Sequence, residues 1–169
     1  MAVKLVAFDV DGVLTDGRLT YTADGEMQKT FHAHDGYGLK LLQQAGFIVA
    51  VISGRDSAPL RRRLADLGIE HMCLGSKNKL SDLQAICATY GWSLADTAFM
   101  GDDLIDYLVM TKVGYRIAPA NAVKDILEIS HHITQKQGGA GAVREAVEHL
   151  LSLRGIAPLT LLDTVDQRQ

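Results

Sequence analysis

Residues 3–15 read VKLVAFDVDGVLT, a short apolar run that ends in Asp9 and Asp11. The run has the length and composition of a buried strand, and the two aspartates follow where such a strand leaves the sheet. In a parallel α/β sheet the ligand crevice lies at the carboxyl ends of the strands, and residues i and i+2 of an extended chain point the same way. We therefore expect Asp9 and Asp11 to converge on a site that needs a proton, a cation or a basic side chain nearby.

Similar apolar runs alternate with amphipathic helical stretches along the rest of the chain, which is typical of βα units around a parallel sheet. The predicted strands are 3–8, 47–52, 71–74, 97–100, 115–118 and a weak one near 132–134. The predicted helices are roughly 37–45, 58–67, 79–90, 104–111, 122–129 and 142–153. We predict a single-domain, three-layer, Rossmann-like α/β fold with helices on both faces of a parallel sheet.

One segment interrupts this alternation. Residues 18–31 contain an Asp24-Gly25 turn between two short strand-like stretches, which predicts a β-hairpin flap inserted after the first strand. Residues 1–154 then form the domain. Residues 155–169 mix leucines with polar residues, and we expect a tail that is either frayed or docked on a neighbouring molecule.

Composition limits the class of protein. The 169 residues are 47% hydrophobic and 22% charged, which indicates one globular domain. No apolar run reaches the ~18 residues of a membrane span and no signal-like segment opens the chain, so we expect a cytoplasmic protein with no membrane partner. The net charge of -3 argues against a nucleic-acid partner. Cys73 and Cys87 form no CxxC motif and lie in apolar surroundings, which predicts reduced thiols.

Two further motifs follow predicted strands. Ser53-Gly54-Arg55 sets a hydroxyl group and a glycine at the start of a helix, where backbone amides favour an anion such as phosphate. Lys79 begins another helix, whose positive dipole end is unfavourable for a cation unless an anion lies nearby. Each signal has an ordinary alternative, with Ser53 or Ser57 as a helix cap and Lys79 as a surface lysine.

The segment GDDLID, residues 101–106, adds three carboxylates after another predicted strand. Asp102 or Asp103 suits a helix cap and Asp106 suits the first turn, yet capping needs only one carboxylate. Together with Asp9 and Asp11 at the same sheet edge, the excess negative charge predicts a hard divalent cation with oxygen ligands, namely Mg²⁺.

These motifs resemble those of the haloacid dehalogenase superfamily of phosphotransferases, in the same order along the chain. The matching segments are DVDGVLTD at 9–16, SGR at 53–55, Lys79 and GDDLID at 101–106. More narrowly, the sequence is similar to the cap-less 3-deoxy-D-manno-octulosonate 8-phosphate phosphatases in the hairpin insert and four segments. Those segments are HDGYGLK at 34–40, SGRDS at 53–57, LGIEH at 67–71 and GGAGAVRE at 138–145.

The resemblance implies a role for each motif. Asp9 would be the nucleophile that forms an aspartyl-phosphate, and Asp11 would act first as general acid and then as general base. Ser53, Gly54 and Lys79 would bind the transferring phosphoryl group. Such a site fits phosphoryl transfer, which depends mainly on positioning and on neutralising the charge of the phosphoryl oxygens.

The resemblance also implies the metal ligands. The carboxylates of Asp9 and Asp102 and the backbone carbonyl of Asp11 would hold Mg²⁺. Asp103 and Asp106 would orient these ligands or bound waters without touching the ion.

Substrate and assembly follow from the same resemblance. The substrate would be the 8-phosphate of an eight-carbon sugar acid used in lipopolysaccharide synthesis, and a homotetramer would cover each site with a neighbour's hairpin and tail. Arg55, Arg63, Lys77 and His34 are candidates for contacting the sugar acid, although Arg63 also suits a solvated helix face. His34 and Ala140, where some relatives carry other residues, leave the choice of sugar open.

Two alternatives remain open from the residues alone. The same chemistry would serve the 9-phosphate of a nine-carbon, sialic-type sugar acid. A phosphorylated signalling receiver also gathers aspartates, a hydroxyl group and a lysine at a parallel sheet edge, although the hairpin insert argues against it.

Overall fold

The computed structural model describes residues 3–23 and 25–164, so Asp24 of the predicted turn and the end of the tail, 165–169, lie outside the described residues. The strands within those ranges are β1 Leu5–Phe8, β2 Thr20–Thr22, β3 Gly25–Gln28, β4 Ile48–Ser53, β5 His71–Leu74, β6 Thr97–Met100, β7 Tyr115–Ala118 and β8 His132–Ile133. The helices are α1 Ala33–Gln44, α2 Ala58–Asp66, α3 Lys79–Thr89, α4 Leu104–Met110, α5 Lys124–Ile129 and α6 Ala142–Leu153, with 3-10 turns η1 Leu94–Asp96 and η2 Pro158–Thr164. None of the helices in these two ranges is long and apolar enough to cross a bilayer.

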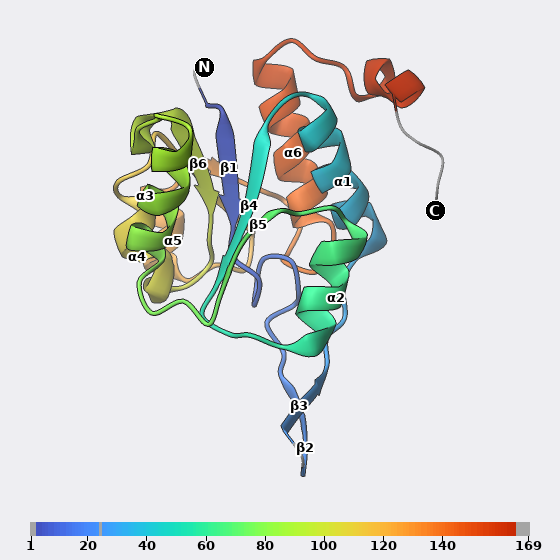
Figure 1. Cartoon of the computed structure of the whole chain (residues 1–169), viewed down its shortest axis with the longest axis vertical. Coiled ribbons are helices and arrows are strands. Elements are labelled where there is room, and N and C mark those ends of the chain that lie inside the picture. The colour runs from blue at the N-terminus through green and yellow to red at the C-terminus, as the bar shows by residue number, and fades with distance from the viewer. Residues whose placement is uncertain (1–2, 24, 165–169) are drawn as a thin grey trace.

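The main sheet has the order β5-β4-β1-β6-β7-β8, and every neighbouring pair is parallel. Figure 1 shows α1, α2 and α6 on one face and α3, α4 and α5 on the other. The predicted three-layer α/β fold is therefore confirmed. In register, Phe8 at the end of β1 pairs with Val51 of β4 and Met100 of β6, so these three strands finish at one edge.

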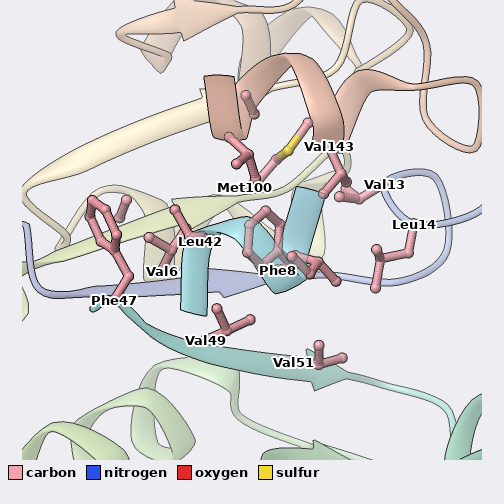
Figure 2. Close-up of a cluster of buried hydrophobic side chains, with 14 of the residues drawn as sticks. Val6, Phe8, Val13, Leu14, Leu42, Phe47, Val49, Val51, Met100 and Val143 are labelled. Carbon is pink, nitrogen blue, oxygen red and sulfur yellow. The ribbon is translucent and has the colours of Figure 1, made fainter. Parts of the chain in front are cut away.

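The two sides of β1 pack against different hydrophobic clusters. Val6 and Phe8 are buried against α1, α2 and α6, the cluster drawn in Figure 2. Leu5 and Ala7 are buried against α3, α4 and α5. Because side chains alternate along a strand, Asp9 continues the side of Leu5 and Ala7 and faces the start of α3 and α4.

The first helix begins earlier than the sequence predicts, at Ala33 rather than residue 37. His32 occupies the N-cap in an extended conformation, and its Nδ1 accepts a hydrogen bond from the His34 amide at 3.2 Å. Gly36 inside the helix obscures this start because glycine is a poor helix former. A methyl group at Gly36 would lie 2.1 Å from Arg63 Nη2, so a larger residue there would displace the end of the Arg63 side chain.

The inserted segment is the predicted hairpin. β2 and β3 pair antiparallel, with a register shift at Thr20 and Tyr21, and project beyond the carboxyl edge of the sheet in Figure 1. At the other end of the chain, η2 places Leu161 against the hydrophobic cluster of the same chain. Cys73 and Cys87 are free thiols, as predicted.

Candidate active site

Lys79 lies at the centre of the candidate site. As the first residue of α3 it is buried, and its Nζ lies 2.6 Å from Asp9 Oδ1 and 2.7 Å from Asp106 Oδ1. Burial lowers the pKa of Lys79, but the two carboxylates outweigh it and hold the pKa above its ordinary value. The surface-lysine alternative is therefore excluded.

Three carboxylates converge beside this lysine. Oxygens of Asp9, Asp102 and Asp106 all lie within 4.8 Å of one another, the one such cluster of potential metal ligands in the described ranges. Burial, then repulsion from Asp106, raises the pKa of Asp9 to about 6 in spite of Lys79. Burial, then repulsion from Asp9 and Asp106, raises the pKa of Asp102 to about 8. A single ammonium group does not balance this cluster.

The geometry around Asp102 fits a divalent cation. Asp102 Oδ1 is buried and has no hydrogen-bond partner in the part of the chain that the structure describes, which leaves it available as a ligand. A methyl group at Gly12, whose φ is +98°, would lie 2.0 Å from Asp102 Oδ2. Glycine at that position therefore lets the loop after β1 touch the carboxylate that follows β6. Carboxylate oxygens in this arrangement are the ligands that Mg²⁺ prefers.

Asp106 is buried and joins Lys79 to the start of α4 through hydrogen bonds. Its Oδ1 accepts from Lys79, and its Oδ2 accepts from the amides of Asp102 at 3.1 Å and Asp103 at 3.5 Å. Asp103 is exposed and caps α4, accepting from the Leu104 amide at 2.7 Å. The capping alternative thus describes Asp103, whereas Asp106 both caps the helix and holds Lys79.

Asp11 differs from the sequence expectation, because its carboxylate is not in the cluster of Asp9 and Asp102. It forms an ion pair with Lys29, and its Oδ2 lies 3.7 Å from Arg55 Nε. The chain turns immediately after β1, where the amide of Val13 donates to the Val10 carbonyl at 3.2 Å, so the i, i+2 rule for an extended strand no longer applies. The expected crowding by like charges therefore occurs at Asp9 and Asp102, while Asp11 faces two cations.

Ser53 is the buried last residue of β4, and its Oγ accepts from the Arg55 amide at 3.2 Å. The expectation that Ser53 opens a helix is wrong, because α2 begins only at Ala58, with Ser57 as its N-cap. Two of the three phosphate-binding candidates nevertheless line the same cavity. Gly54 and Lys79 line one cavity of about 320 Å³, together with Lys77 and the apolar start of α4.

The other substrate candidates are dispersed. Arg55 lies beside Asp11, but Arg63 packs over the Phe31 ring at 5.9 Å from its centroid. His34 is exposed and lines a separate cavity beside α6. Arg61 and Arg62, which precede Arg63 on α2, are exposed and pair with Asp56 and Asp66.

Asp35 is a buried carboxylate that the sequence interpretation missed. Its oxygens accept from the amides of Gly141 at 3.2 Å and Arg144 at 2.8 Å, at the start of α6. This contact joins the HDGYGLK and GGAGAVRE segments. A methyl group at Gly138 would lie 1.8 Å from the Gly12 carbonyl oxygen, so the glycine-rich segment in turn supports the acidic loop. The signal available in the sequence was an aspartate, Asp35, inside the HDGYGLK segment.

Comparison with known proteins gives the family. A model of haloacid dehalogenase-like hydrolases matches residues 72–146. The chain is 42% identical over 153 residues to the 3-deoxy-D-manno-octulosonate 8-phosphate phosphatase of Haemophilus influenzae, covering 90% of this chain and 85% of that one. This chain belongs to the 3-deoxy-D-manno-octulosonate 8-phosphate phosphatase family. The corresponding enzyme of Escherichia coli K12 is 38% identical over 153 residues, covering 90% and 81%.

Solved structures of family members agree with the fold. The cobalt-bound form from Haemophilus influenzae superposes with a TM-score of 0.88 at 42% identity, covering 91% of this chain and 90% of that one. The Moraxella catarrhalis enzyme, in complex with magnesium, phosphate and the sugar acid, gives 0.86 at 41% identity, covering 89% and 87%. The resemblance stated from the motifs is therefore confirmed.

Proposed function

We propose that this protein is a Mg²⁺-dependent phosphatase that hydrolyses 3-deoxy-D-manno-octulosonate 8-phosphate to the free sugar acid and phosphate, a step of lipopolysaccharide precursor synthesis. The observation that carries the proposal is the convergence of Asp9 and Asp102 within reach of one ion, with Lys79 beside the Asp9 oxygen. Family membership supplies the substrate, because relatives at 38–42% identity carry that name.

The reaction would proceed in two displacements. A carboxylate oxygen of Asp9 attacks phosphorus, the bond from phosphorus to the sugar oxygen breaks, and Asp11 donates a proton to that oxygen as it leaves. Water then attacks the phosphorus of the aspartyl-phosphate, Asp11 takes the proton of that water, and the Asp9 carboxylate is restored as phosphate leaves. Each step conserves charge and needs no further reactant.

The surrounding residues would bind and orient the phosphoryl group. The carboxylates of Asp9 and Asp102 and the backbone carbonyl of Asp11 would hold Mg²⁺, which would supply positive charge to the phosphoryl group. Ser53, at the end of β4, and the adjacent Gly54 would donate hydrogen bonds to the phosphoryl oxygens, and Lys79, whose Nζ lies 2.6 Å from Asp9 Oδ1, would contact them beside the nucleophile.

The same proposal covers positioning, substrate recognition and assembly. Asp103 and Asp106 would keep the metal ligands in place, and Arg55, Arg63, Lys77 and His34 would contact the sugar acid. The protein would act in the cytoplasm as a homotetramer.

A phosphate-release assay across sugar phosphates tests the function. We expect turnover of the eight-carbon substrate with Mg²⁺, none in EDTA, and none for Asp9→Asn. Asp16→Asn is the matched control, because that aspartate lies on the same loop but its side chain is 51% exposed and pairs with Arg18. Robust turnover by Asp9→Asn would refute the nucleophile. A kcat/KM that is higher for a nine-carbon 9-phosphate than for the eight-carbon 8-phosphate would show that the nine-carbon sugar acid is the preferred substrate. A long-lived phosphoprotein without turnover would indicate a signalling receiver.

A further inference from the structure

The hairpin places a buried cation on Asp11. Lys29 follows β3 directly, and its Nζ forms an ion pair with Asp11 Oδ1. The Lys29 side chain is only 1% exposed, whereas the Asp11 side chain is 21% exposed, so the lysine lies on the inner side of the pair. Lysine is rarely buried to this degree unless a carboxylate pairs with it.

The second oxygen of Asp11 is held through the other strand of the hairpin. Arg55 Nε lies 3.7 Å from Asp11 Oδ2, and Arg55 Nη1 donates to the Tyr21 hydroxyl at 2.9 Å. Tyr21 belongs to β2, while Lys29 follows β3. The hairpin therefore contacts both oxygens of the carboxylate, one directly and one through Arg55, and fixes the orientation of the group in space.

We propose that Lys29 is a positioning residue for the acid–base step, holding the Asp11 carboxyl group where it can give a proton to the leaving oxygen and then, as the carboxylate, take one from water. This inference rests on the proposed phosphatase function. A general acid must lie within hydrogen-bond reach of the atom that it protonates, and small displacements of a catalytic group reduce rates strongly. The hairpin then takes part in positioning the acid–base group of its own chain.

The chemistry of the leaving group separates this role from a structural one. A sugar alkoxide is a poor leaving group and needs the Asp11 proton as the phosphorus–oxygen bond breaks. An activated phosphate, such as p-nitrophenyl phosphate or acetyl phosphate, releases a stable anion without a proton. The kcat/KM value reports the steps up to departure of the leaving group, so loss of positioning lowers it for the sugar phosphate and spares it for the activated substrate.

The test compares Lys29→Met, which keeps the length of the side chain and removes its charge, with Lys29→Arg. For Lys29→Met we expect kcat/KM on the sugar phosphate to fall about 10–100-fold, a part of the usual contribution of general acid catalysis. The activated substrate is whichever of p-nitrophenyl phosphate and acetyl phosphate wild type hydrolyses faster. On that substrate the kcat/KM of Lys29→Met should stay within about threefold of wild type. Lys29→Arg should recover most of the loss, because it restores a cation.

Arg18→Met is the matched control. Arg18 lies on the same inserted segment and also approaches an aspartate, Asp16, at 3.9 Å, but its side chain is 89% exposed. Its kcat/KM should stay within about twofold of wild type, as expected of an exposed ion pair. Equal losses on both substrates for Lys29→Met, or no loss on either, would overturn the inference. Failure of wild type to hydrolyse the sugar phosphate would instead overturn the proposed function.

Discussion

Replacing Asp102 by asparagine tests both the charge crowding and the metal site. Asparagine has nearly the shape of the neutral carboxylic acid and carries no charge at any pH. The ordinary pKa of aspartate is 3.8, whereas burial first, and then Asp9, Asp106 and Asp103, raise the pKa of Asp102 to about 8. Between these two values the folded protein binds more protons than the unfolded chain. The stability of the metal-free wild type must therefore fall as pH rises through this window.

The size of the effect follows from that difference. At about 1.4 kcal/mol for each tenfold change in the acid constant, ionising Asp102 in the folded state costs about 6 kcal/mol, and partial solvent access reduces this to about 2–3 kcal/mol. For a domain of this size that energy corresponds to a Tm difference of about 5–10 °C. In EDTA, the Tm advantage of Asp102→Asn over wild type should therefore be small near pH 4, grow as the pH rises toward 8, and reach about 5–10 °C at pH 9.

Thermal unfolding by circular dichroism, with EDTA or Mg²⁺, provides the measurement. Mg²⁺ at 100 times its Kd should stabilise wild type by about 2.7 kcal/mol, and should leave Asp102→Asn almost unchanged. The advantage of Asp102→Asn in Tm should therefore nearly vanish when Mg²⁺ is added at pH 9. A variant without a pH-dependent advantage in EDTA would contradict the crowding, and equal stabilisation of both proteins by Mg²⁺ would show that Asp102 is not a ligand.

Three further substitutions have defined outcomes. Lys79→Met leaves Asp9 and Asp106 without their cation, so the free energy of unfolding should fall by about 3–5 kcal/mol at pH 8 and by less at pH 5, measured by urea unfolding. Asp35→Ala removes the acceptor of two amides and should reduce it by about 2–3 kcal/mol in the same assay. Gly138→Ala drives a methyl group into a backbone carbonyl and should cost about 3 kcal/mol, with lower Mg²⁺ affinity by calorimetry.

Local patterns predicted most of the secondary structure. The strands that end in Phe8 and Met100 are buried on both faces and therefore read as continuous apolar runs. The start of α1 was misplaced because a histidine serves as its cap and glycine stands in its first turn, and neither is a typical helix signal. The helix predicted over 58–67 is present as α2, but Ser53 does not open it, since four residues separate that serine from Ala58.

The sequence also predicted which aspartates lie at the site, but it did not predict which of them cluster together and which pair with a lysine. Aspartates after two strands of a parallel sheet must approach one edge, so Asp9 and Asp102 were expected near one ion. Nothing local indicated that Asp11 would turn away toward Lys29, because that contact joins residues eighteen positions apart through the path of the hairpin. The same limit applies to Asp35, whose partners lie more than a hundred residues away.

The order of apolar runs, glycines and carboxylates was thus sufficient to specify the class of fold and the chemistry of its sheet edge, because hydrophobic periodicity and strand polarity act locally. Long-range packing settled which carboxylate meets which cation: Lys79 with Asp9 and Asp106, and Lys29 with Asp11. Such pairings depend on how turns and helices bring distant side chains to within a few ångströms. The energy of a buried charge is sensitive to distances on that scale, which spacing along the chain does not encode.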